Sequence, residues 1–169
     1  MRPEEERYMA FEGLVQWTQA VVGQARRVQA AKDRLGASIT GDPASRRAVV
    51  LWTHVEDHFF IIAANKLIEY RHWVATFGLC SSIDFREIDR FSVSNIKDLR
   101  NMREHVVEYF RGEGRVRDRW VVETPEYRAD ASSVVGPMLG GRLDWVAFAT
   151  AAERLLPALL AEPIPYPSR

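Results

Sequence analysis

The sequence contains one cysteine, only three lysines and no apolar run long enough to span a membrane. The single cysteine, Cys80, excludes an internal disulfide framework and a zinc site built from cysteines. Because the apolar runs are short, we expect no transmembrane helix and no membrane partner. Segment 1–6 is acidic where a secretory signal peptide would be basic, so we expect a cytoplasmic protein.

A net charge of one sign is also lacking, because 23 basic residues balance 23 acidic ones. The chain as a whole therefore has no net positive charge that would attract nucleic acid, although a local basic patch could still do so. Of the basic residues 20 are arginine, whose planar guanidinium suits phosphate better than an ammonium does. With 47% hydrophobic and 27% charged residues, the composition is that of an ordinary folded protein. We interpret residues 1–169 as one helical domain.

Proline placement organises the chain. No proline occurs between Pro43 and Pro125, and apolar residues in this stretch recur at helical spacing. Asp42 before Pro43 is typical of an N-cap followed by proline at the first helical position. The pattern predicts four main helices, at 4–35, 43–77, 94–111 and 143–161.

Each predicted helix has an apolar face that we expect to be buried. In the second helix this seam consists of Leu51, Val55, Phe59 and Ile62. In the third helix, which we expect Ser94 to cap, the seam consists of Ile96, Leu99, Val106, Val107 and Phe110.

The residue pattern changes between the third and fourth predicted helices. Short β-branched runs and glycine or proline turns predict a small β-hairpin or irregular insertion over 115–141. Three prolines in the last residues predict an extended tail over 162–169. The expected fold is thus mainly α, a bundle of about four long helices with a small insertion before the last helix.

The third helix carries a polar stripe opposite its apolar seam. Asn101 and His105 lie one turn apart on this stripe, flanked by Asp98 and Tyr109. Arg100 is about 140° from His105 around the helix. Its long side chain must therefore wrap towards the stripe, or the site needs a second protomer.

Arg100, the polar Asn101 after it and His105 together resemble the Arg-x4–6-His motif of HEPN domains. The order of elements is also similar over 44–111 and the last helix, whereas segment 115–141 departs from the minimal bundle. Arg47 and His54 match the same spacing, but an alanine follows Arg47.

Several expectations follow from the resemblance. Many HEPN domains are dimeric, metal-independent ribonucleases, or toxins of toxin–antitoxin or defence systems. The resemblance implies that the protein acts on RNA or a nucleotide and needs no cofactor. It also implies that the protein forms a homodimer and has an antitoxin partner. In this interpretation His105 is the acid or base, Arg100 holds the phosphate and Asn101 orients the imidazole or binds the scissile phosphate. A basic run just beyond the motif is a candidate RNA-binding segment, comprising Arg111, Arg115, Arg117 and Arg119.

Two other interpretations stay open. If Arg100 and His105 are solvated surface residues, the chain is a non-catalytic interaction module built on a helical bundle. Alternatively, His54 and His58 are spaced as metal ligands can be, and His105 completes a three-histidine site similar to that of DinB-like proteins. Cys80 has no base nearby in the sequence, and we expect a buried structural thiol.

Overall fold

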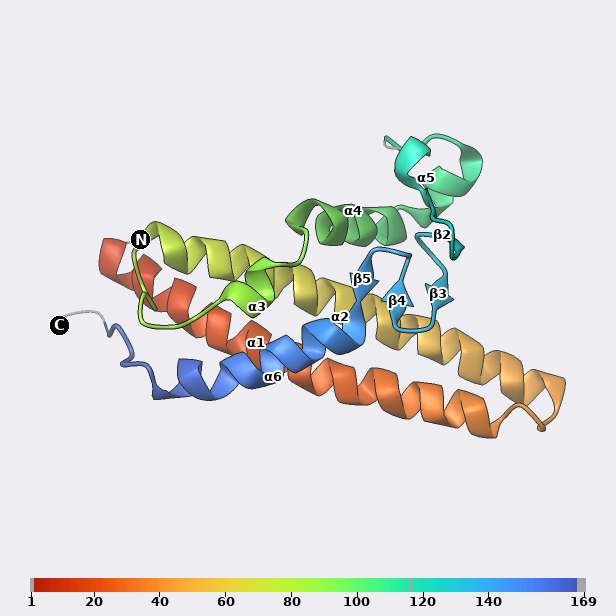
Figure 1. The fold of residues 1–169 in the computed structure, drawn as a ribbon, viewed down its shortest axis with the longest axis horizontal. Helices are drawn as coiled ribbons and strands as arrows, with labels where there is room; N and C mark the ends of the chain where they lie inside the picture. The colour runs from red at the N-terminus through yellow and green to blue at the C-terminus, as the bar shows by residue number, and fades with distance from the viewer. Residues whose placement is uncertain (1, 116, 167–169) are drawn as a thin grey trace.

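Two long antiparallel helices dominate the computed structural model, which describes residues 2–115 and 117–166 (Figure 1). They are α1 (Pro3–Ala37) and α2 (Pro43–Thr76), which pack along each other as a hairpin. Asp42 caps α2 as predicted, because its carboxylate accepts hydrogen bonds from the Ala44 and Ser45 backbone N–H groups at 2.9 and 3.0 Å.

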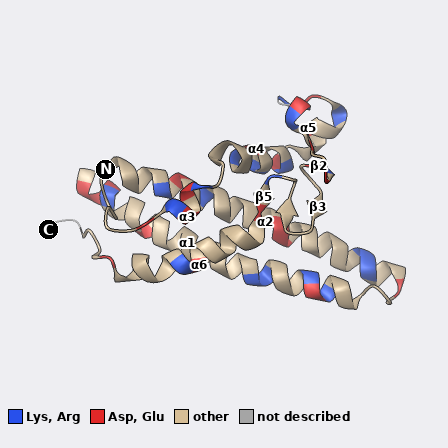
Figure 2. Ribbon diagram, viewed as in Figure 1, with Lys and Arg blue, Asp and Glu red and all other residues tan. Residues whose placement is uncertain are grey.

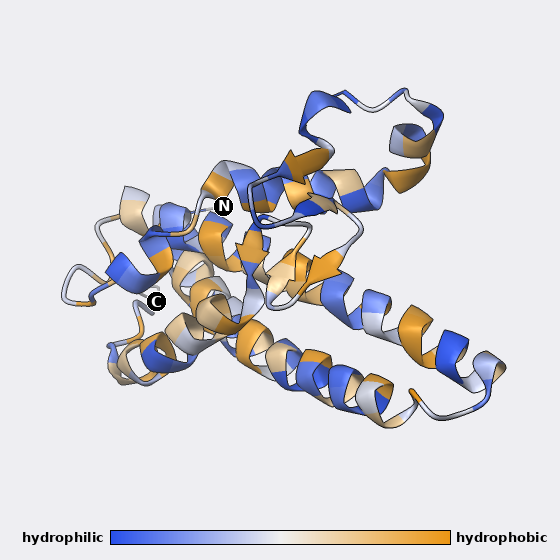
Figure 3. Ribbon diagram, turned by 45° about the vertical axis from the view of Figure 1, so that its right-hand side comes forward, coloured by the Kyte–Doolittle hydropathy of each residue, from blue (hydrophilic) through white to orange (hydrophobic). Residues whose placement is uncertain are grey.

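Shorter helices cover this hairpin. The last helix, α6 (Trp145–Ala161), packs on α1, and α4 (Val93–Glu104) packs on α2. A single turn, α3 (Arg86–Asp89), contacts α6. Figure 3 shows hydrophobic residues concentrated where these helices meet and recurring towards the far end of the hairpin. The largest fully buried side chains include Leu14, Phe60, Leu67, Leu99 and Phe148. The described part of the chain is therefore mainly α, as the sequence predicts.

The predicted seam of α2 is wrong. Leu51, Val55 and Phe59 are exposed, and the buried face instead carries Phe60 and Ile61. The first half of α2 extends beyond α4 and α6 and packs along α1, and the β3–β4 hairpin (residues 134–139) approaches it near Val50 and His54. The side chains of Leu51, Val55 and Phe59 lie outside these contacts and remain exposed to solvent.

Polar residues occupy part of the true α1–α2 contact. Gln24 of α1 donates a hydrogen bond of 2.5 Å to the buried Glu56 carboxylate, and Lys32 lies 3.8 Å from the buried Asp57. Hydrophobic spacing alone cannot identify this face, because its polar members are buried by partners on another helix.

The third predicted helix is also wrong as a single element. It begins after Ser92, whose hydroxyl accepts a hydrogen bond from the Asn95 N–H, and it breaks at His105 (φ −109°, ψ 28°). A separate short helix, α5 (Val106–Arg111), follows. The apolar face of α4 ends at Met102, and the predicted seam residues Val107 and Phe110 are exposed. At His105 the chain turns away from α2, and the apolar residues that follow are therefore not buried against it (Figure 1).

The insertion before α6 contains two small antiparallel sheets. A hairpin joins β1 (Val121–Glu123) to β2 (Arg128–Asp130), and a three-stranded sheet comprises β3 (Val134–Val135), β4 (Met138–Leu139) and β5 (Leu143–Asp144). The predicted insertion is thus present, and β5 occupies the first two residues predicted for the last helix.

The end of the described chain is not helical beyond α6. Pro157 lies within α6, and Tyr166 stacks on Tyr8 of α1 with ring centroids 5.8 Å apart. Residues 167–169 of the predicted tail lie outside the described residues. Among the helices of residues 2–115 and 117–166, none is long and apolar enough to cross a membrane.

Candidate functional site

A cleft of about 490 Å³ opens at the junction of α4 and α5. Asp98 and Asn101 enter it from α4, His105 from the junction itself, and Glu108 and Tyr109 from α5. Arg115, after α5, completes the described lining. The break at His105 brings the two helix faces together around this cleft.

His105 combines exposure with a fixed partner. Its side chain is 56% exposed, as the polar stripe predicts, and its Nδ1 lies 2.9 Å from Glu108 Oε1. When Nδ1 donates its hydrogen to this carboxylate, Nε2 keeps a free lone pair. The pair therefore resembles an oriented base that can take a proton from a bound molecule.

Tyr109 lines the cleft and belongs to a small aromatic cluster. Tyr109 stacks on Trp120 with centroids 5.0 Å apart, and the exposed Phe110 meets Trp120 edge-on at 5.7 Å. A Cβ at Gly114 would lie 2.6 Å from the Tyr109 ring, so only glycine lets the loop pass so close. Stacked rings of this kind hold the wall of the cleft in place.

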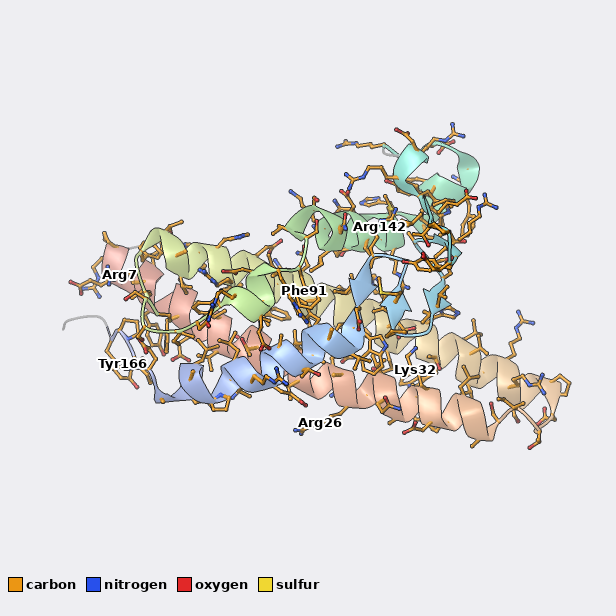
Figure 4. All side chains as sticks on the ribbon, viewed as in Figure 1. Arg7, Arg26, Lys32, Phe91, Arg142 and Tyr166 are labelled. Atoms are coloured by element: carbon orange, nitrogen blue, oxygen red, sulfur yellow. The ribbon has the colours of Figure 1, made fainter. Side chains whose placement is uncertain are left out.

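Charges of both signs surround the cleft. Asp98 forms an ion pair with Arg119, and Arg142 donates a 2.8 Å hydrogen bond to the Gly140 carbonyl. Burial and the neighbouring Arg119 lower the pKa of Arg142, and Asp98 opposes this shift. Figure 4 shows Arg142 beneath α4, and Figure 2 shows basic and acidic residues interleaved along α4 and α5. The site is polar and mixed in charge.

The structure does not bring Arg100 into the cleft. Arg100 is absent from the cleft lining and pairs with Glu104, with Nη1 3.3 Å from Oε2. Burial raises the pKa of Glu69 on α2, but hydrogen bonds from Lys66 and Asn65, together with the charge of Arg100, outweigh this effect and lower it. The expectation that Arg100, Asn101 and His105 line one cleft is therefore wrong for Arg100, because α4 turns this residue towards α2.

The four arginines of the predicted RNA-binding run separate from one another. Arg115 lines the cleft, Arg119 is paired with Asp98, and the Arg117 guanidinium lies against Gly112. Arg111 ends α5 and is exposed. Only Arg115 combines exposure with a place in the cleft.

The alternative histidine metal site does not form. In residues 2–115 and 117–166, no three His, Cys, Asp or Glu side chains converge into a set that could hold a metal ion. His54 and His58 lie on α2, whereas His105 points into the cleft beyond α4. Cys80 is buried as expected, and burial raises the pKa of its thiol to about 11.

The sequence analysis missed Glu108, which lines the cleft, and Arg142, which interacts electrostatically with Asp98 and Tyr109 of that lining without belonging to it. Glu108 lies three positions after His105, and this helical spacing could have identified it as a partner of the imidazole. Arg142 comes from the turn before β5, and no local pattern connects it with α4.

Comparisons of this chain with family models, with curated proteins and with solved structures find no match.

Proposed function

We propose that the protein cleaves or binds RNA, or a nucleotide, at the cleft beside His105, as a HEPN-like, metal-independent endoribonuclease. The observation that supports this most is the exposed His105, oriented by Glu108, in a cleft that also contains Asn101 and Arg115. Metal-free cleavage of a phosphodiester needs a base for the 2′-hydroxyl, a proton for the leaving 5′-oxygen and positive charge on the phosphate. In this cleft His105 can act as the base and Arg115 can supply the positive charge.

The proposed step uses His105 Nε2 as the base. Nε2 removes the proton of the 2′-hydroxyl, the 2′-oxygen attacks phosphorus, and the bond from phosphorus to the 5′-oxygen breaks. The leaving oxygen takes a proton from solvent in the open cleft, so that the products are a 2′,3′-cyclic phosphate and a 5′-hydroxyl. Arg115 pairs with the phosphate, and Asn101 donates a hydrogen bond to one of its oxygens.

In this proposal Arg100 is a positioning residue. Its ion pair with Glu104 spans the last turn of α4, directly before the break at His105. Loss of this pair would displace the imidazole without removing a group that touches the phosphate. Arg115→Ala should therefore mainly raise KM, and Arg100→Ala should mainly lower kcat.

The test is incubation of single-stranded RNA with the purified protein in the presence of EDTA. Cleavage should continue in EDTA and fall by about 10²- to 10⁴-fold in His105→Ala, as expected for loss of a positioned base. His72→Ala is the matched control, since His72 is an exposed histidine on α2 far from α5 along the chain. If the parent protein does not cleave RNA, the ribonuclease hypothesis is wrong, and the non-catalytic interaction module becomes the better interpretation.

The proposal includes a homodimer formed through α5. Val107 is 57% exposed and Phe110 71%, directly beside the cleft, and two copies that bury these side chains would enclose both sites. Sedimentation at micromolar concentration should show a dimer that Phe110→Asp dissociates. Leu160→Asp, a change at a residue on α6 that is 60% exposed, should leave it intact.

A further inference from the structure

One face of the first half of α2 is apolar and exposed, towards the end of the hairpin that extends beyond α4 and α6 (Figure 1). Trp52 and Phe59 are each 52% exposed on this face. The members of this face, which we call the α2 face, recur every three or four positions, as in a helix that packs lengthwise on another helix. They are the exposed Ala48, Leu51, Trp52, Val55 and Phe59 and the half-buried Ile62.

The α2 face carries no charge. Between Arg47 and Lys66 the only Asp, Glu, Lys or Arg residues are Glu56 and Asp57, and both are buried. The face ends at Lys66, which pairs with Glu69 at 2.7 Å. A partner can therefore cover the face without burying an unpaired ion, and the face has no cation of its own to pair with phosphate. This favours a protein over a nucleic acid as the partner.

The two ends of the α2 face differ in shape. At its N-terminal end, a hollow of about 320 Å³ is lined by Ala48, Val49 and Trp52 of α2 and by Arg34 of α1. Towards the other end the ring of Phe59 is exposed, about two turns further along the helix than Trp52. One end therefore presents a recess that is large enough for an aromatic ring, and the other presents such a ring.

We propose that the α2 face binds the α2 face of a second copy of this chain, with the two helices antiparallel about a two-fold axis at Val55. Positions 48 and 62 are equally distant from position 55, so Ala48 of one copy meets Ile62 of the other, a small residue against a large one. In this register Phe59 of each copy lies beside the hollow of the other and fills it, as a knob fills a hole in a coiled coil. The Arg34 guanidinium, which lines that hollow, then lies close to the ring and adds a cation–π contact.

The area of the α2 face is that of a weak but specific contact. An aromatic side chain has about 150–250 Å² to bury, so the half-exposed Trp52 and Phe59 together offer about 200 Å² per copy. Leu51, Val55 and the smaller members roughly double this value, and two copies would bury about 800–1,000 Å² in total, at the lower limit of specific interfaces. The proposal depends neither on RNA cleavage at His105 nor on the contact through α5, because α5 shares no residue with the α2 face.

The test is sedimentation at about 100 µM in the Phe110→Asp background, in which the contact through α5 is removed. This chain should be partly dimeric, and Phe59→Asp in the same background should be monomeric. Leu160→Asp is the matched control, since Leu160 is an exposed residue of α6, and it should leave the dimer intact. A monomer in the Phe110→Asp background, or equal masses with and without Phe59→Asp, would overturn the proposal.

A cross-link locates the contact and keeps the test decisive if Phe59→Asp does not fold. In the antiparallel register Val55 lies next to Val55 of the second copy, so Val55→Cys should form a covalent dimer under mild oxidation. The native Cys80 is buried and does not compete. His72→Cys, at an exposed position of the same helix outside the α2 face, should remain free of cross-links. A covalent dimer in both variants, or in neither, would contradict the proposal.

Discussion

The long-helix scaffold and the connecting segment (residues 105–142) differ in how they are held. The scaffold of α1, α2 and α6 surrounds fully buried aromatic and aliphatic side chains such as Leu14, Phe60 and Phe148. In α5 and in a 3-10 turn at Arg117–Arg119, both in the connecting segment, no described residue is buried, and ion pairs and stacked rings predominate. Most of the buried core of this protein thus lies in the scaffold, with Ala131 and Leu139 added from the connecting segment, whereas the cleft lies between the connecting segment and α4.

The largest expected effect is in the scaffold. Phe60→Ala removes a fully buried ring that meets Trp145 and Phe148 edge-on, and it should lower the free energy of unfolding by about 3–5 kcal/mol. The neighbouring Phe59 is the matched control, because it is 52% exposed and Phe59→Ala should cost less than about 1 kcal/mol. Urea denaturation measures both. Equal losses would contradict the assignment of the α2 core face.

The next largest effect is expected where the connecting segment packs on α4. Gly140 has φ +54°, and a Cβ there would lie 2.4 Å from Leu99 Cδ1 and 3.1 Å from the Ala131 backbone. Gly140→Ala should therefore destabilise the protein by about 2–4 kcal/mol, from backbone strain and overpacking together.

Gly136 is the control for this substitution. Its φ of +57° is nearly the same, but its Cβ would meet nothing within 4 Å. Gly136→Ala should show the strain alone, about 1 kcal/mol. If the two variants have the same thermal midpoint, the turn at Gly140 does not press on α4 as the structure indicates.

The long helices and the small β-insertion before α6 were predictable from sequence, whereas the buried face of α2 and the break at His105 were not. Asp42 and Pro43 gave the start of α2 correctly, because caps act through the backbone of the next few residues. The buried face of α2 escaped prediction because Glu56 and Asp57 are buried by Gln24 and Lys32, which lie on another helix. The burial of Glu56 and Asp57 depends on how α1 packs against α2, which the sequence of α2 alone does not show.

The candidate site shows the same division. Asn101 and His105 were placed correctly on one polar surface by helical periodicity. The break at His105 then changed which arginine accompanies them, bringing in Arg115 and leaving Arg100 outside. Periodicity predicts a face only as far as the helix continues.

A smaller effect is expected for the ion pair that ties the connecting segment to α4. Arg119→Ala leaves the mostly buried Asp98 without its cation and should cost about 0.5–1 kcal/mol, less at high salt. Arg128→Ala is the control, since Arg128 and Glu123 are both well exposed and their charged atoms are 3.9 Å apart. Thermal unfolding at low and high salt should separate the two variants, and identical salt responses would argue against a tie at Asp98.

The smallest effect concerns His58, where α2 of the scaffold meets the end of α4. Burial, aided by Arg103 and opposed by Glu104, lowers the pKa of His58 in the folded protein. The unfolded chain therefore binds the proton more readily, and the stability contributed by neutral His58 is present above about pH 6.5 and lost as the pH falls through the lower folded pKa. The loss is small because water screens a partly exposed ring.

His58→Gln should flatten the dependence of the thermal midpoint on pH between about pH 7 and 5, whereas His72→Gln, at an exposed position of the same helix, should leave it unchanged. A steeper dependence in His58→Gln would mean that protonated His58 is stabilised by Glu104, and that α4 approaches α2 more closely through its acidic residue than through Arg103.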